Sequence, residues 1–200
     1  MEIEYFNKPF HHTIIYDYFD DNEIISIKNE INQIEDGTLK NNYDEQDRHH
    51  DELFKKFNVD SYHIDKMFAN NRNGSVLLKA ITKVYYLHNN GFFNKQKNPF
   101  LNFIPDSNQD ITMLHGYRNS SSYPKHIDKA VLSFVYPFWN EPKDFTGGDL
   151  MFGDYKPPLK SNCCLIFPSY EPHWVTKIKS KKSDIVRWTL NQRIFIKKDL

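Results

Sequence analysis

The stretch HIDKAVLSFVYPFW, residues 126–139, sets a His-Ile-Asp motif at the head of a long apolar run. The run of apolar, β-branched and aromatic residues predicts one strand over residues 125–138. Side chains alternate between the two faces of a strand, so His126 and Asp128 would project together and Ile127 would project to the other side. The motif therefore predicts an imidazole and a carboxylate that could share one ligand.

A third candidate ligand is His173, in the segment EPHWV at residues 171–175. It comes 45 residues after Asp128, so a different strand must bring it to the motif. Two imidazoles and one carboxylate, with coordination positions left open, suit non-haem Fe(II) that activates oxygen. The competing interpretation is a surface motif in which Asp128 forms a salt bridge and His173 is unrelated.

Short apolar segments dominate the second half of the chain. They predict strands at residues 111–117, 125–138, 149–152, 162–167, 173–179 and 185–196. The pair Gly147-Gly148 predicts a bulge or a tight bend before the third of these strands. The order is thus a His-x-Asp motif, apolar strands with a double glycine, a Pro-His pair, and an arginine, Arg187, on the last strand.

That order resembles the 2-oxoglutarate/Fe(II)-dependent oxygenases, and most of all their prolyl-4-hydroxylase-like branch. The resemblance covers residues 111–196. It implies an α+β fold, a double-stranded β-helix (jelly roll) with the N-terminal helices packed outside. It also implies that His126, Asp128 and His173 are the metal ligands and the catalytic centre, with 2-oxoglutarate and O2 taking the remaining positions on the iron.

The resemblance further implies a basic residue for the far carboxylate of 2-oxoglutarate, and Arg187 is the first candidate. Arginine presents a planar fork that matches a carboxylate. Arg187 follows His173 by 14 residues, a longer spacing than the family leads us to expect, and residues 176–184 would form a hairpin tip that absorbs the extra length. Arg193 is the competing candidate, and the remaining alternative is that neither arginine binds the cosubstrate.

Tyrosines near the motif are candidates for contact with 2-oxoglutarate, as members of the family use tyrosines in these regions. Tyr117 and Tyr136 are expected to bind the cosubstrate, and Tyr123 is a weaker candidate. By strand alternation Tyr136 would share a face with His126 and Asp128. A tyrosine in a strand is also a common core residue, which leaves packing as the alternative.

The N-terminal half predicts mainly helices. We expect an edge strand within residues 1–20 and then a helix that Asp20 or Asp21 caps, with an apolar stripe of isoleucines. Further helices are expected at residues 51–57, 61–69 and 75–88, and a strand at 100–104. We interpret residues 1–200 as a single domain, with helical support over about 20–90 and the jelly-roll core over about 100–197. The segments 38–60 and 89–110 are candidate lids.

Composition limits the class of protein further. The chain has 200 residues and a formal net charge of zero, which disfavours a general electrostatic grip on nucleic acid. Its two cysteines, Cys163 and Cys164, are adjacent, so they form no disulfide framework, and we expect one to face the core and one to face out. We expect no membrane span and a cytoplasmic location. The pairs at residues 11–12 and 49–50 are interpreted as solvated surface histidines.

The sequence therefore predicts a 2-oxoglutarate- and Fe(II)-dependent dioxygenase. Its substrate would be a prolyl residue of a peptide or protein, with O2 as co-reactant and ascorbate as a further candidate cofactor. The alternatives are an oxygenase that acts on a free amino acid or other small molecule or on a nucleobase, and a cupin-like module that binds metal without turnover. A zinc hydrolase with the same ligands is the weakest alternative, because no general base stands beside them.

Overall fold

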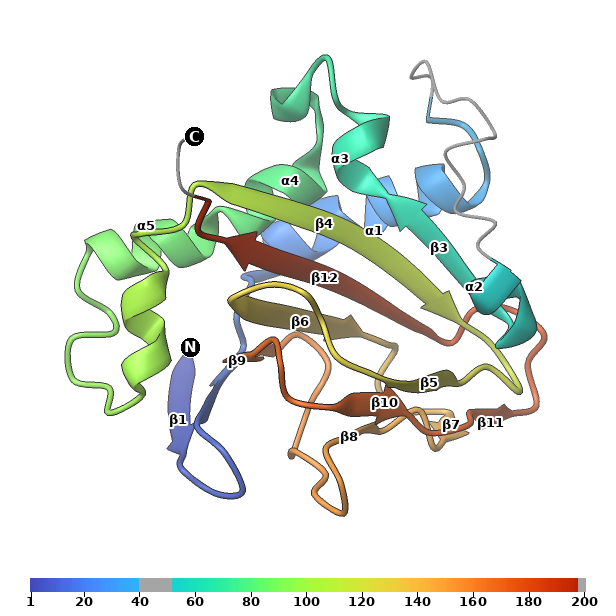
Figure 1. Ribbon diagram of the computed structural model, residues 1–200. Coiled ribbons are helices and arrows are strands. Elements are labelled where there is room, and N and C mark those ends of the chain that lie inside the picture. Colours follow the sequence, from blue (N-terminus) through green and yellow to red (C-terminus); the bar gives the residue numbers. More distant parts are fainter. Residues whose placement is uncertain (40–51, 198–200) are drawn as a thin grey trace.

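The computed structural model describes residues 1–39 and 52–197. Two layers of β-structure face each other, and helices cover the outer face of the larger layer (Figure 1). This α+β jelly-roll architecture confirms the predicted fold class. The site lies between the two layers, so the way in which each strand divides its side chains decides what the site contains.

The larger layer is a seven-stranded antiparallel sheet in the order β1-β2-β9-β6-β12-β4-β3. Its strands are β1 (Glu2–Phe6), β2 (His12–Tyr16), β3 (Val59–His63), β4 (Gln109–Tyr117), β6 (Leu132–Phe138), β9 (Cys164–Pro168) and β12 (Arg187–Phe195). The smaller layer has a three-stranded sheet in the order β5-β10-β8 and a two-stranded pair β11-β7. Its strands are β5 (Tyr123–His126), β7 (Phe145–Thr146), β8 (Leu150–Met151), β10 (His173–Val175) and β11 (Lys179–Ser180).

Helices occupy the outer side of the larger sheet (Figure 1). They are α1 (Asp21–Glu35), α3 (Ile64–Met67), α4 (Val76–Ile81) and α5 (Lys83–Asn89), with 3-10 helices η2 (Arg72–Gly74) and η3 (Pro99–Phe103). A further helix, α2 (Glu52–Lys56), precedes β3, and its Phe54 packs into the core between the two sheets. Helix α1 begins where the sequence predicts it. Asp20 caps α1 by accepting from the backbone N–H of Glu23, whose side chain bonds back to the Asp20 N–H. Ile27, Ile31 and Ile34 then bury the apolar stripe.

Alternation along the strands of the larger sheet builds two cores instead of one. On β9, Ile166 points into the core beneath the helices, whereas Leu165 and Phe167 point into the core between the sheets. The expectation that one cysteine faces out is therefore wrong. Cys164 lies in the helix-side core and Cys163 in the inter-sheet core, and both are fully buried, because this sheet is covered on both faces.

The predicted single strand over residues 125–138 is also wrong. The chain forms β5 up to His126 in the smaller sheet, turns, and starts β6 at Leu132 in the larger sheet. Asp128 therefore lies in the turn and not in a strand. The predicted hairpin tip at residues 176–184 instead connects the two layers, since β10 belongs to one and β12 to the other.

The N-terminal half differs from expectation at several elements. Residues 61–63 belong to β3, because pairing with β4 overrides their helical spacing, and α3 starts only at Ile64. The helix expected over 75–88 is divided at Thr82 into α4 and α5, and residues 100–104 form most of η3 with Pro99 at its start.

The N-terminal strand is a hairpin, β1-β2, in which β1 forms the edge. His12 on β2 is buried and hydrogen-bonded to Tyr155, so its interpretation as solvated is wrong.

The two candidate lids have different outcomes. In the 89–110 segment, Phe93, Leu101 and Ile104 are buried in the helix-side core, which fixes this connection against the helices. Most of the 38–60 segment, including the pair at residues 49–50, lies outside the described residues. Its described end contains Phe54 on α2, whose ring centroid is 5.2 Å from that of His115 in the inter-sheet space.

Candidate metal centre and cosubstrate pocket

His126 and His173 are cross-strand partners in the smaller sheet. β5 pairs with β10 in an antiparallel register that sets the two residues opposite each other, and their ring centroids are 4.2 Å apart. Each ring is fixed by its Nδ1–H. His126 donates to the carbonyl oxygen of Pro124 at 3.0 Å, and His173 donates to that of Glu171 at 2.8 Å. These bonds leave both Nε2 lone pairs free for a metal ion.

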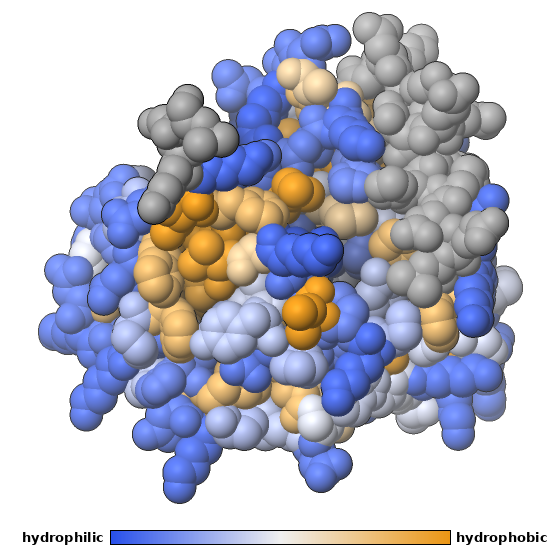
Figure 2. Space-filling view, in the orientation of Figure 1, coloured by the Kyte–Doolittle hydropathy of each residue, from blue (hydrophilic) through white to orange (hydrophobic). Residues whose placement is uncertain are grey.

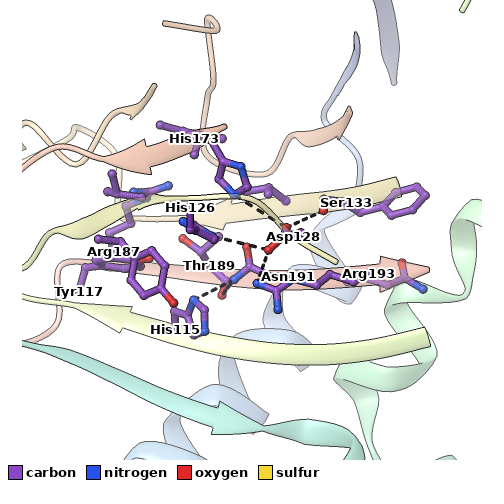
Figure 3. Close-up of a pocket in the computed structure, with 16 residues that line it drawn as sticks. His115, Tyr117, His126, Asp128, Ser133, His173, Arg187, Thr189, Asn191 and Arg193 are labelled. Atoms are coloured by element: carbon purple, nitrogen blue, oxygen red, sulfur yellow. Dashed lines mark hydrogen bonds and ion pairs between the residues drawn. The ribbon is translucent and has the colours of Figure 1, made fainter. Parts of the chain in front are cut away.

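Asp128 completes the cluster from the turn after β5. Its Oδ1 is 3.6 Å from Nε2 of His126, and its Oδ2 is 3.8 Å from Nε2 of His173 (Figure 3). One donor atom from each residue lies within 4.8 Å of the others, a spacing that a single metal ion can bridge. Ile127, between the first two, is 53% exposed. The predicted trio is thus brought together, although by a turn and not by strand alternation.

Hydrogen bonds hold the carboxylate of Asp128 in place. The Asp128 backbone N–H donates to the carbonyl oxygen of Ser169 at 2.9 Å, which ties the turn to the end of β9. The Ser133 hydroxyl donates to Oδ2 at 2.6 Å, and the hydroxyls of Ser133 and Ser169 are 2.8 Å apart. Partners of this kind orient a ligand before the metal arrives.

The electrostatics of the cluster suit metal binding. Burial opposes ionisation of Asp128, but the charge of Arg193 and the hydrogen bond from Ser133 lower its pKa below the ordinary range. Burial and the neighbouring His126 lower the pKa of His173 to about 4. At neutral pH the trio therefore offers a carboxylate and a neutral imidazole from these two residues, which are the forms that bind a metal.

Arg187 lies at the start of β12 and is 2% exposed. It lines the same cavity as His126, Asp128 and His173. Its Nη1 donates to the carbonyl oxygen of Gly148 at 2.6 Å, and its guanidinium carbon is 5.2 Å from the centroid of the Tyr117 ring. Its Nε is buried without a hydrogen-bond partner, and no carboxylate among the described residues forms an ion pair with it. A buried guanidinium without a counter-ion is costly, so this position fits an anionic ligand.

The double glycine shapes this end of the cavity. Gly147 and Gly148 have φ values of +70° and +65°, and a Cβ on Gly147 would lie 2.1 Å from the carbonyl oxygen of Lys177. The bend predicted from the sequence is confirmed. It aims the Gly148 carbonyl at Arg187, and burial raises the pKa of the neighbouring Tyr117 to about 12, so that tyrosine keeps its hydroxyl proton.

Tyr136 lies away from this cavity. It is fully buried in the helix-side core, 5.4 Å from the ring of Tyr18 and 5.8 Å from that of Phe19, and its hydroxyl donates to Gln192 at 3.2 Å. The alternation argument that placed it beside His126 is wrong, because the turn between β5 and β6 resets the register. Tyr117 and Tyr123 both line the cavity.

Sequence reasoning gave too little weight to three residues that line the cavity: His115, Asn191 and Arg193. His115, on β4, accepts from the Asn191 amide at 3.2 Å, and its Nε2 is buried without a partner. Arg193 forms an ion pair with Asp128, Nη2 to Oδ1, at 2.7 Å. The signal was present: residues 189, 191 and 193 share the strand face of Arg187.

No family model and no curated protein sequence matches the chain. Solved structures do match.

A Pseudomonas putida prolyl-4-hydroxylase superposes with a TM-score of 0.53 and 18% identity, covering 94% of this chain and 93% of that one. A Trichoplax adhaerens prolyl hydroxylase was solved with a peptide fragment of the hypoxia-inducible factor oxygen degradation domain. It superposes with a TM-score of 0.59 and 16% identity, covering 92% of this chain and 83% of that one. The protein NgTET1, solved with DNA containing 5mC, superposes with a TM-score of 0.55 and 13% identity, covering 93% of this chain and 72% of that one.

These structures define the class of fold. The chain has the jelly-roll fold of the prolyl-4-hydroxylase-like 2-oxoglutarate/Fe(II) oxygenases, and the resemblance found in the sequence is confirmed at that level. In the part of the chain that the structure describes, no helix is long and apolar enough to cross a membrane.

Proposed function

We propose that this protein is a 2-oxoglutarate- and Fe(II)-dependent dioxygenase. One observation carries the proposal. A His-Asp-His trio with converging donor atoms and a buried arginine without a counter-ion line one cavity. His126, Asp128 and His173 would hold Fe(II) on one face. Arg187 and Thr189, whose buried hydroxyl also has no partner, would hold the far carboxylate of 2-oxoglutarate, with Tyr117 packed against the guanidinium.

Iron with 2-oxoglutarate and O2 supplies the oxidising power: the keto acid is cleaved to succinate and CO2, and one oxygen atom is inserted into a substrate C–H bond. The protein residues orient and enclose these reactants. The hydrogen bonds from both Nδ1 atoms fix the imidazoles, Ser133 fixes the carboxylate, and the inter-sheet core around Val175 and Leu150 keeps bulk water from the inner end of the cavity.

For the prime substrate, we propose a prolyl residue in a peptide or protein. Support comes from the two prolyl hydroxylases among the structural neighbours, one of them solved with a peptide. Ile127, which lies between His126 and Asp128 and is 53% exposed, offers an apolar contact next to the metal position. Apolar residues gather on the face of the molecule that Figure 2 shows. Ascorbate would serve, as an external reductant, to return oxidised iron to Fe(II).

The proposal is tested by succinate release and O2 uptake with Fe(II) and 2-oxoglutarate, first alone and then with a proline-containing peptide library read by mass for one added oxygen. Wild type should release succinate, and His126→Ala should not. The anaerobic spectrum of the Fe(II) protein should change when 2-oxoglutarate is added.

Succinate release without added metal, or full turnover in His126→Ala, would refute the metal assignment. Iron binding without any response to 2-oxoglutarate would instead support a metal-binding module of cupin type. Oxygen insertion into nucleosides and not into peptides would reverse the substrate assignment.

A further inference from the structure

Two arginines project from one face of β12 into the same cavity. Arg187, Thr189, Asn191 and Arg193 alternate with residues that face the helices, so they form a row along the strand (Figure 3). Arg187 is enclosed at one end. Arg193, whose side chain is 24% exposed, lies beside Asp128 and can be reached from outside. The proposed binding of 2-oxoglutarate uses only the first of them.

The charges in the cavity do not balance without a further anion. Among the described residues that line it, Asp128 is the single carboxylate, and Arg187 and Arg193 are the permanent cations. Fe(II) adds two positive charges and 2-oxoglutarate adds two negative ones, so those two cancel. Asp128 then balances one arginine, and one positive charge remains. An uncompensated charge in a buried site is costly, which favours a ligand that brings one negative charge.

Unused hydrogen-bond donors lie beside that surplus charge. Arg193 binds Asp128 through Nη2, whereas the Nε of Arg193 is buried without a partner. The Nε2 of His115 is also buried without a partner. Because the Asn191 amide donates to Nδ1 of His115, the proton of the neutral ring lies on Nε2, which is thus a donor.

Burial and the charge of Arg193 lower the pKa of His115 to about 3, so the ring stays neutral. Arg193 would then supply the charge, and His115 a second donor.

We infer that Arg193, assisted by His115, binds a carboxylate of the prime substrate next to the metal. A carboxylate brings one negative charge and two acceptor atoms in a plane, which matches a guanidinium edge. The inference rests on the proposed oxygenase function and narrows its substrate class. The carboxylate could be the α-carboxylate of a free amino or imino acid, or an acidic side chain or C-terminus of a peptide. Arg193 is therefore a specificity-determining residue.

The experiment compares acids with their neutral amides. The probes are L-proline and L-prolinamide, N-acetylproline and its amide, and a proline peptide with glutamate or glutamine beside the proline. Oxygen insertion is read by mass, and binding to the Zn(II)- and 2-oxoglutarate-loaded protein is read by calorimetry. Wild type should favour at least one acid over its amide by about 10-fold or more. The pair that shows the preference identifies the source of the carboxylate.

Arg193→Gln should lose this preference, and Arg193→Lys should keep part of it. Arg72→Gln is the matched control, because Arg72 pairs with Asp65 and Asp110 outside the cavity, and it should keep the full preference. Since Arg193 also contacts Asp128, metal loading of each variant is checked by the anaerobic Fe(II) spectrum with 2-oxoglutarate. A purely structural role for Arg193 would lower loading or turnover equally for acid and amide.

The outcomes separate the two proposals. If wild type forms no succinate from 2-oxoglutarate, the proposed function fails. If succinate forms but every acid and amide pair is treated alike, or if Arg193→Gln keeps the preference for the acid, the oxygenase stands and the assignment of Arg193 is overturned.

Discussion

The rings of His126 and His173 face each other across one rung of the smaller sheet, with centroids 4.2 Å apart. Both have Nδ1 bound to the carbonyl oxygen of the residue two positions earlier. The same local bond thus orients both rings, and the pairing of β5 with β10 sets the distance between them. The site is therefore largely organised before any metal binds, and only Asp128 depends on a turn for its place.

The first prediction concerns the hydroxyl that holds Asp128. Ser133→Ala removes the 2.6 Å bond to Oδ2 and leaves the carboxylate oriented only by Arg193 at Oδ1. Loss of a residue that orients a metal ligand typically lowers metal affinity or activity by about 10–100-fold. The dissociation constant for Fe(II), measured without oxygen, should rise by that factor. Ser26→Ala on the exposed face of α1 is the control, and an equal constant for both variants would contradict the role of Ser133.

The second prediction concerns Arg187. Arg187→Met removes the only described cation at the inner end of the cavity, where each charge-assisted hydrogen bond contributes about 1.5–3 kcal/mol. The KM for 2-oxoglutarate should therefore rise by about 10–100-fold, while the affinity for Fe(II) stays unchanged. Arg187→Lys should have a smaller effect, since it keeps the charge and loses the fork. Arg118→Met, which removes a surface ion pair with Asp60, should leave the KM unaltered.

The third prediction compares two glycines that both have positive φ. Gly147→Ala and Gly153→Ala, at +70° and +59°, share the cost of placing an alanine in the left-handed region. Only the first adds a clash, because its Cβ would lie 2.1 Å from the Lys177 carbonyl oxygen, whereas nothing lies within 4 Å at Gly153. In urea unfolding, Gly147→Ala should lose about 1–3 kcal/mol more than Gly153→Ala. Equal losses would show that the bend tolerates a side chain.

The fourth prediction concerns acid stability. Burial and the charge of Arg193 lower the pKa of His115 to about 3, from the ordinary value of 6.5. Between these values the unfolded chain binds a proton that the folded protein does not, so His115 makes the free energy of unfolding fall as the pH drops below 6.5. The slope is at most about 1.4 kcal/mol per pH unit.

His115→Gln should remove this part of the pH dependence. The measurement is urea unfolding of the metal-free protein between about pH 7 and pH 4, in which the stability of wild type should fall more steeply than that of the variant. His88→Gln, which removes an imidazole from α5 outside the cavity, is the control. The same flattening in both variants would show that His115 is not the group responsible.

The amino-acid sequence by itself determined the jelly-roll class, the trio of donors and the start of α1. The jelly-roll class followed from the resemblance of the motif order to a known family. The other two features follow from local causes: Asp20 satisfies the free N–H groups of a helix start, and His-x-Asp followed by a distant histidine is a recognisable set of donors. The double glycine was equally readable, because only glycine fits that bend.

Only the tertiary structure decided how those donors meet and what surrounds them. Strand alternation fixes which face of its own sheet a side chain takes, but not what that face meets. Tyr136 therefore fell on the helix side once the chain turned at Asp128, and Arg193 and His115 joined the cavity once β12 and β4 packed against the smaller sheet. Such contacts join residues far apart along the chain, here 65 positions from Asp128 to Arg193, and the packing of the two layers sets them.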